Sequence, residues 1–465
     1  MKSLLIWSVV LLALLGPACY NGYPLVFSDT GTYIESGWEG FVPKDRPIAY
    51  GLFLLGSSLG LTLWLPILFQ AIAVTWVLWE SCRWVLPTMR IRLFALLVII
   101  LSMISGLGWY TSQLMPDVFT PLSLLGMTLL LLHRELPLWK KMLLAAVVIM
   151  AVNVHFSHYL IAGLTFLLIL LAKWRSWLPE SMAQRIRWKL AAGVLVGSLV
   201  CGSLVNYAYS DSFRITQGSH VYLMGRMLDS GVLKQFLEDR CGQNSYALCP
   251  YKDELPANNR ELLWNLDSPL YQQGGWEGSR QAYMQILWGI ARSPKHLGMF
   301  VYRGFTSGLA QLFQIDVGSG LITGWYANPN SSPYQKVAKY LPHELSPYLN
   351  SRQNENLWGQ GLEIDLVQDL NRLATLLSLC IWGLLGLSRG RRLSLPPAFT
   401  LFAWVVLGGI IVNAFVTASL ANVFDRLQAR VSWMLIWYAL MVVIAVPKGF
   451  WKEVWQAIVA SAPTS

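Results

Sequence analysis

Long apolar runs separated by short polar segments dominate the pattern of this sequence. A helix needs about 20 apolar residues to cross the hydrocarbon core of a bilayer. The sequence therefore predicts an all-α polytopic membrane protein with about ten transmembrane helices. The expected spans are the run that ends near residue 18 and the runs 48–79, 93–108, 117–132, 142–156, 158–172, 189–207, 371–387, 397–417 and 431–447.

Lysine and arginine residues are concentrated in alternate loops between these runs. Cytoplasmic loops of membrane proteins carry an excess of Lys and Arg. Counting from Lys2, every second loop is basic, so both termini are expected in the cytoplasm, with the first loop and the long polar region on the outer, periplasmic side of an inner membrane. The other basic loops are 82–92, 133–141, 173–189, 388–392 and 448–452.

The polar region 208–370 divides the chain into three parts. We expect an N-terminal transmembrane module over 1–207, a mainly helical outward domain over 208–370, and a C-terminal transmembrane module over 371–465. Within the outward domain, the stretch 296–313 is apolar on one side but contains Arg303. A helix lying in the membrane interface is preferred there, because an eleventh span would turn the next basic loop outward.

The composition supports a membrane location and argues against nucleic acid. Only 13% of the residues are charged and 55% are hydrophobic, whereas soluble domains carry about 25% charged residues. The formal net charge of +10 lies in loops beside apolar runs, where membrane lipids are the natural partner. The 22 Trp and 19 Tyr residues are typical of aromatic belts at the two interfaces.

Two of the six cysteines, Cys241 and Cys249, lie close together in the outward domain. An oxidising compartment permits disulfides, so we predict a bridge that closes a small loop, with two free thiols as the alternative. A zinc site is less favoured because no His or further Cys lies close in the sequence.

Charged residues gather at the outward ends of the predicted spans. Ionisable groups near a membrane are usually paired or functional. By the predicted topology, these residues meet at the outer surface of the membrane. They are Asp29, Glu35, Glu39, Lys44, Asp45 and Arg46 in the first loop, Asp117 at the start of the fourth span, and Asp425, Arg426 and Arg430 before the last span.

Several of these residues have a structural alternative. Asp29 lies in a Ser-Asp-Thr-Gly stretch, so it serves either as a general base or as a turn and helix-start residue. Asp117 follows Pro116, and helix capping is the favoured interpretation. His155 and His158 are three residues apart and suit a metal pair, although bonding to headgroups or backbone is more common for interfacial histidines.

Arg426 and Arg430 are four residues apart, so one helical face presents both. A guanidinium matches phosphate oxygens in a bidentate manner. The alternatives are anchoring to lipid headgroups and a simple Asp425–Arg426 ion pair. A polyprenyl-phosphate sugar would use all these features, because its tail stays in the bilayer and its phosphate at the interface. Sugar transfer needs a base for the acceptor hydroxyl and cations for the phosphate leaving group.

Four short motifs resemble the membrane glycosyltransferases of the GT-C fold. They are the first loop at 27–33, the entry to the second span at 46–54, the turn at 114–117 and the segment 425–431 before the last span. Leu427 stands where that family usually has Tyr. Some members carry an Asp-Glu pair, whereas here Thr30 follows Asp29.

The resemblance implies a polyprenyl-phosphate-linked sugar donor and a lipid, glycan or protein acceptor at the outer face of a bacterial inner membrane. It implies an inverting transfer, either metal-independent or assisted by a divalent cation. Asp29 would be the catalytic carboxylate, with Asp45 and Asp117 as substitutes. The phosphate-binding cations would be Arg46, Arg426 and Arg430.

Two other classes of protein are considered. An O-antigen-type polymerase or ligase of lipid-linked glycans would place its catalytic residues in the outward domain, with Arg214, His220 and Arg226 as candidates. A lipid or glycan transporter would need charges at mid-membrane and often has inverted repeats. The sequence shows neither, because its charges lie at the ends of spans.

Overall fold

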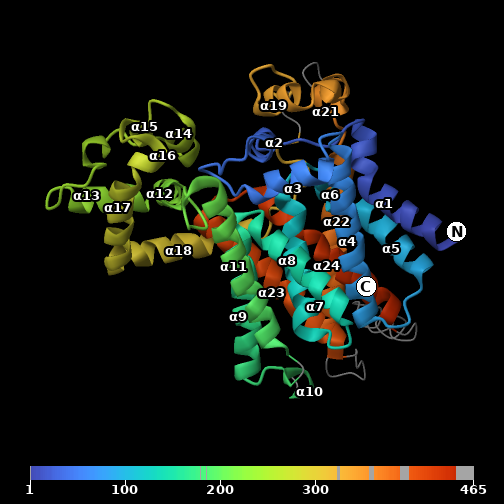
Figure 1. Ribbon diagram of the computed structural model, residues 1–465. Helices are drawn as coiled ribbons and strands as arrows, with labels where there is room; N and C mark the ends of the chain where they lie inside the picture. Colours follow the sequence, from blue (N-terminus) through green and yellow to red (C-terminus); the bar gives the residue numbers. More distant parts are fainter. Residues whose placement is uncertain are drawn as a thin grey trace, which may run out of the picture.

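The computed structural model describes residues 2–446 apart from 179, 185, 322–324, 356–360 and 388–396. All regular elements of this part are helices, and its only β feature is an isolated bridge between Leu25 and Gln113. Figure 1 shows long helices side by side in a bundle, with short helices at one end and on one side. The predicted all-α class is confirmed.

Five of the described helices are long and apolar enough to cross a membrane. These apolar helices indicate a membrane protein, while the count of ten spans stays a prediction. The five are α4 (Trp64–Val85), α9 (Phe156–Trp174), α11 (Trp188–Ser210), α23 (Pro397–Leu420) and α24 (Asp425–Ala445). The other bundle helices are α1 (Lys2–Asn21), α3 (Ala49–Ser58), α5 (Ile91–Ile104), α6 (Leu107–Thr111), η1 (Pro116–Val118), α7 (Phe119–Leu132), α8 (Leu138–Asn153) and α22 (Asp365–Leu387), with the short α10 (Glu180–Ala183) in a connection.

The apolar run 48–79, predicted as one span, is broken into α3 and α4, so this prediction is wrong. Leu59 and Gly60 between them have left-handed backbones, with φ of 54° and 68°, and a helix cannot continue through that conformation. The turn is fixed from far along the chain, because Leu63 N donates to the carboxylate of Glu344 at 3.2 Å. Hydropathy does not reveal such a distant anchor.

Six helices of the polar region 208–370 form a unit, called here the outward unit after the predicted topology, with its own hydrophobic core beside the bundle (Figure 1). Val221, Phe236 and Ile286 lie in this core. The predicted Cys241–Cys249 disulfide is confirmed, with Cα atoms 5.6 Å apart. The helices are α12 (Ser219–Asp229), α13 (Val232–Arg240), α14 (Asn259–Trp264), α15 (Pro269–Gln272), α16 (Gly275–Gly278) and α17 (Arg280–Arg292).

Helix α18 (Pro294–Gln311) connects this unit to the bundle and runs across the long helices in Figure 1. It packs tightly on α23, since a Cβ on Gly308 would lie 2.6 Å from the ring of Phe415. Its exposed side carries Val301, Tyr302 and Phe305. The helix predicted over 296–313 is therefore present, and its position in the membrane interface stays a prediction.

The rest of the outward region packs over the first loop instead of joining α12–α17. It contains α19 (Ser332–Tyr340), α20 (Leu345–Leu349) and α21 (Arg352–Glu355), and lies beside α2 (Thr30–Glu39) in Figure 1. Lys336 pairs with Glu35, and Lys339 with Glu39. The packing of α19–α21 and these two ion pairs fix the position of α2 and of the loop that precedes it.

Candidate functional site

The six residues predicted as catalytic or phosphate-binding lie in one row of alternating carboxylates and guanidinium groups, called here the ion-pair network. Three distant segments supply it: the loops that flank α2, the turn η1, and the first turns of α24. The structure brings the six together, and their roles stay predictions. The pairs are Arg46 Nη2 to Asp45 Oδ2 (2.5 Å), Arg46 Nη1 to Asp29 Oδ1 (3.2 Å), Arg426 Nη1 to Asp29 Oδ2 (3.6 Å), Arg426 Nε to Asp117 Oδ2 (4.0 Å) and Arg430 Nη1 to Asp117 Oδ1 (3.2 Å).

Asp29 lies at the N-cap position of α2, yet its side chain makes no capping hydrogen bond. The carboxylate faces Arg46 and Arg426 instead and is 28% exposed. Burial alone would raise the pKa of Asp29, but the two guanidinium groups outweigh it and hold the pKa below its ordinary value. The helix-start alternative therefore does not describe this carboxylate, which is ionised and faces two cations.

Arg46 is fully engaged at the outer end of the network. Its Nε and Nη2 both donate to Asp45 Oδ2, at 2.9 and 2.5 Å, and its Nη1 donates to the carbonyl of Asp29 at 3.3 Å. Its guanidinium also lies over the ring of Tyr33, at 5.1 Å from the centroid. Asp45 is thereby committed to orienting Arg46, which makes it a weaker candidate for the base than Asp29.

Arg426 is the least satisfied cation of the network. Its guanidinium lies over the ring of Phe27, at 4.1 Å, and its side chain is 17% exposed. Among the described residues, its buried Nη1 has no hydrogen-bond partner, and the same holds for Nε of Arg430 and Oδ2 of Asp117; Arg430, however, uses its other two nitrogens in hydrogen bonds. Asp425 does not pair with Arg426, since its Oδ1 accepts from a backbone N–H in the loop after α18. A buried donor without a partner is costly unless something else binds it.

Arg430 and Asp117 form the inner end of the network, with side chains 0% and 2% exposed. Arg430 Nη2 also donates to Asn413 Oδ1 at 3.1 Å and to Ser157 Oγ at 3.4 Å. Asp117 therefore serves as a counter-ion inside the bundle and not as a helix cap. Sequence reasoning missed Asn413, although a polar residue within an apolar span is a signal of an inward-facing contact.

The histidine pair is arranged for hydrogen bonding and not for metal binding. The rings of His155 and His158 are 5.1 Å apart. Both nitrogens of His158 are used, since Nδ1 lies 2.6 Å from Ala151 O and Nε2 lies 2.6 Å from Thr120 Oγ1. His158 therefore has no lone pair for a metal.

A divalent cation, which the resemblance allows, does not fit the network as the structure shows it. Each carboxylate faces a guanidinium, so a cation would have to displace an arginine before it met two acidic ligands. The described part of the chain also contains no group of three or more His, Cys, Asp or Glu residues that could hold a metal.

The candidate residues of a polymerase or ligase do not form a charged cluster. His220 Nε2 lies 2.7 Å from the carbonyl of Trp276, and Arg226 Nη2 donates to Ser307 Oγ at 2.7 Å. Arg214 is exposed. Each of the three has its own surroundings within the outward region.

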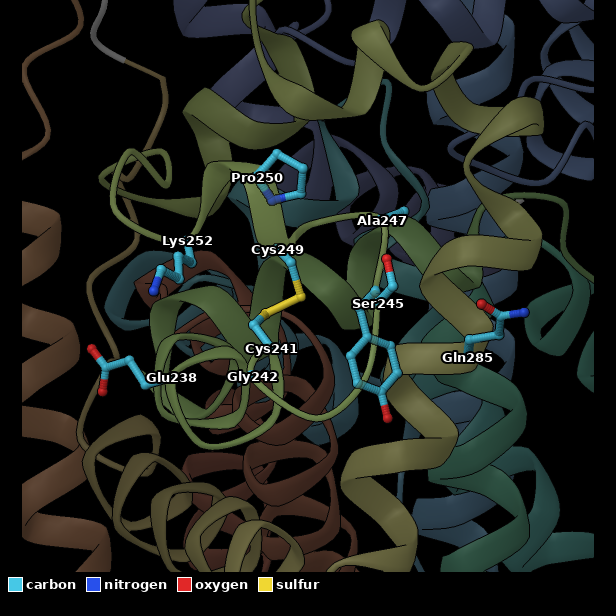
Figure 2. Close-up of a pocket in the computed structure, with 10 residues that line it drawn as sticks. Glu238, Cys241, Gly242, Ser245, Ala247, Cys249, Pro250, Lys252 and Gln285 are labelled. Atoms are coloured by element: carbon cyan, nitrogen blue, oxygen red, sulfur yellow. A yellow bond between two sulfur atoms is a disulfide. The ribbon is translucent and has the colours of Figure 1, made fainter.

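Two cavities lie away from the network. One, of about 690 Å³, adjoins the disulfide in the outward unit, and Figure 2 shows Glu238 and Lys252 on one side of the Cys241–Cys249 bridge and Gln285 on the other. The second, of about 470 Å³, lies between α4 and the α7–α8 connection.

The fold and the network together define an all-helical membrane protein with a cluster of alternating charges at the ends of its helices. No protein-family model, curated protein or solved structure matches the chain. What the chain does must therefore be inferred from its own residues.

Proposed function

We propose that this protein is a membrane glycosyltransferase that moves a sugar from a polyprenyl-phosphate carrier to a hydroxyl group of a lipid, glycan or protein at the outer face of an inner membrane. One observation carries the proposal: the buried Nη1 of Arg426 lacks a hydrogen-bond partner among the described residues and lies 3.6 Å from the Asp29 carboxylate. A phosphate-binding donor and a base for a hydroxyl are thus neighbours.

Arg426 is suited to bind the phosphate of the donor. It lies in the first turn of α24, where the helix dipole also favours an anion. The α24 helix is one of the five apolar helices, but neighbouring helices bury most of it, so the lipid tail would lie on the surface of the bundle outside α24. Arg430, with its buried partner Asp117, would keep the first turns of α24 in place without touching the donor.

Asp29 would accept the proton of the acceptor hydroxyl. The acceptor oxygen then forms a bond to the anomeric carbon, and the bond from that carbon to the phosphate oxygen breaks, with its electron pair leaving on the phosphate. Arg426 stabilises this developing charge. Because the phosphate competes for Arg426, donor binding removes one of the two cations beside Asp29 and makes the carboxylate a stronger base.

The outward unit of α12–α17 would select the acceptor. It docks on the loop before Arg46, where Lys44 pairs with Glu277 at 3.3 Å and a Cβ on Gly218 would lie 2.3 Å from the carbonyl of Lys44. Burial raises the pKa of Tyr222 in α12, and the negative charge of Asp45 raises it further. The second contribution indicates that this tyrosine lies near the network. An acceptor that approaches Asp29 from this side would meet the outward unit.

A transporter is less well supported, because Asp117 lies in the short helix η1 and Arg430 in the second turn of α24, near helix ends and not at the middle of a long apolar helix. The proposed test uses purified protein with farnesyl-phosphoryl hexoses and pentoses as donors and a membrane lipid extract as acceptor. Mass spectrometry measures released farnesyl phosphate and the glycosylated product. The Asp29→Asn variant is expected to lose about 10²–10⁴-fold in turnover.

The matched control is Glu39→Gln, which removes another carboxylate on α2 that is paired with Lys339 and lies outside the network. It should retain turnover close to that of the unchanged protein. Full turnover in Asp29→Asn at normal abundance would refute the assignment of the base. Transfer of labelled sugar across the membrane without a new glycosidic bond would refute the enzyme class.

A further inference from the structure

The cavity of about 470 Å³ lies at the end of the bundle opposite the ion-pair network. Helix α4 starts beside the turn that Glu344 holds, near α2, and its 22 residues span about 33 Å. The hydrocarbon core of a bilayer is about 30 Å thick. The far end of α4, which lines the cavity, is therefore at the other membrane interface.

The lining of this cavity combines cations with two indole rings. Arg83, Arg134 and Lys140 line it, together with Trp79 and Trp84. Its remaining residues are Glu80, Pro87, Leu132, His133, Glu135, Leu136, Pro137 and Ala398.

The two carboxylates do not cancel the positive charge. Glu80 is buried, with a side chain 6% exposed, and is paired with Lys140 at 2.5 Å. The second carboxylate, Glu135, is exposed, as are Arg83 and Arg134, and Arg134 Nη2 donates to the carbonyl of Gln184 at 2.5 Å. With three cations and two carboxylates, the lining is net cationic, and Arg83 is one of its exposed cations.

Arg83 is oriented in a way that suits an anion. Its guanidinium lies over the ring of Trp79, at 5.6 Å from the centroid. Such a cation–π contact holds the guanidinium beside the ring without using its N–H donors. Trp84 is stacked on His133, with ring centroids 6.4 Å apart. Tryptophan is enriched at the boundary between headgroups and acyl chains, which suits this end of the bundle to a membrane interface.

We propose that this cavity binds the phosphate headgroup of an anionic membrane lipid. Basic hollows between helices at a membrane interface are where such headgroups bind, and a guanidinium donates two parallel hydrogen bonds to a phosphate. The volume suits a headgroup, while the acyl chains would lie along the apolar surface of α4. The site is separate from the ion-pair network and does not depend on the proposed transferase activity.

Two kinds of lipid carry this chemistry, a phospholipid and a polyprenyl phosphate. The test measures the thermal stability of the purified protein in detergent during titration with dihexanoyl phosphatidylglycerol, dihexanoyl phosphatidylcholine, farnesyl phosphate or inorganic phosphate. A ligand that binds the folded state raises its stability according to its dissociation constant. The variant is Arg83→Gln, and the control is Arg92→Gln, which removes an exposed arginine at the same basic end that does not line the cavity.

The anionic lipid is expected to stabilise the protein more than the zwitterionic one. Arg83→Gln should weaken its binding about fivefold, the loss of one arginine near an anionic headgroup, whereas Arg92→Gln should not. Arg83→Lys keeps the charge and should restore part of the affinity. If only farnesyl phosphate depends on Arg83, the lipid is a polyprenyl phosphate. Equal binding of phosphatidylcholine, equal effects of the two glutamine variants, or dependence on Arg83 for inorganic phosphate alone would overturn the proposal.

Discussion

Replacing Asp117 by Asn should destabilise the bundle far more than the same change at Asp29. Asp117 is 2% exposed and lies 3.2 Å from the fully buried Arg430. Two charges at that distance interact by about 5 kcal/mol at an effective dielectric constant of 20. Removing one partner of a buried pair is known to cost about 3–5 kcal/mol, because the other charge is left uncompensated. We expect a loss in this range for Asp117→Asn.

Asp29 is 28% exposed, so water can replace part of its interaction with the arginines. The expected loss for Asp29→Asn is about 1 kcal/mol or less. The assay is equilibrium unfolding by dodecyl sulfate in mixed micelles, followed by far-ultraviolet circular dichroism. The same variants are then tested for donor turnover, which should be lost in Asp29→Asn while the fold is retained.

The double variant Asp117→Asn with Arg430→Gln provides the control. Replacing both members of a buried pair by neutral groups is often close to neutral for stability. The double variant should therefore be more stable than Asp117→Asn alone. The reasoning is refuted if Asp117→Asn costs no more than Asp29→Asn, or if the double variant loses the sum of the two single effects.

Three further predictions concern the first loop and the outward region. Because its pKa is lowered, Asp29 contributes stability that is present above its ordinary pKa of about 3.9 and is lost only as the pH falls through the lowered value. Asp29 therefore stays ionised, and kcat/KM for the donor should not fall between about pH 7 and 5. A fall in kcat/KM over that range would exclude Asp29 as the base of the free enzyme. Cys249→Ser opens a loop whose ends are 8 residues apart and should lower the free energy of unfolding of the outward unit by about 2.5 kcal/mol. Limited proteolysis should then cleave this unit faster, and an unchanged rate of cleavage would contradict the prediction. In Gly31→Ala, the new Cβ would lie 2.2 Å from Ser332 Oγ and 2.5 Å from the Ser332 backbone. Helix α19 should therefore move away from α2, and amide hydrogen exchange over α19 should become faster. An unchanged exchange rate would contradict the close packing of α2 and α19.

The sequence predicted a larger set of charges at one surface than the six that meet in the network, since Glu35, Glu39 and Lys44 pair elsewhere. Asp29, Asp117 and Arg430 belong to three segments that the count of apolar runs and basic loops predicted on the same side of the membrane, and the structure brings these three side chains together. The alternation of carboxylates and guanidinium groups in the network was not predictable, because it depends on the directions of side chains, which the positions of helix ends do not determine. The Cys241–Cys249 bridge was predictable, since the two residues are close in the chain and no other cysteine is near them.

The break at Leu59 and Gly60 could not be seen in an apolar run. It depends on Glu344, which lies 282 residues after Thr62 and accepts a hydrogen bond from Thr62 Oγ1 at 2.5 Å. The arrangement of His158 was also hidden, because its two partners lie on other segments. In both cases a contact between residues far apart in the chain determines the local structure, and the local sequence pattern cannot predict such a contact.

A structure of the purified protein with farnesyl phosphate bound would test the central claim most directly. The account predicts that the phosphate lies within hydrogen-bond distance of Arg426, and that the Asp29 carboxylate faces the same space while Arg46 keeps its contact with Asp45. A phosphate bound only elsewhere, with Arg426 still directed at Asp29, would contradict the account and leave Asp29 as a structural counter-ion.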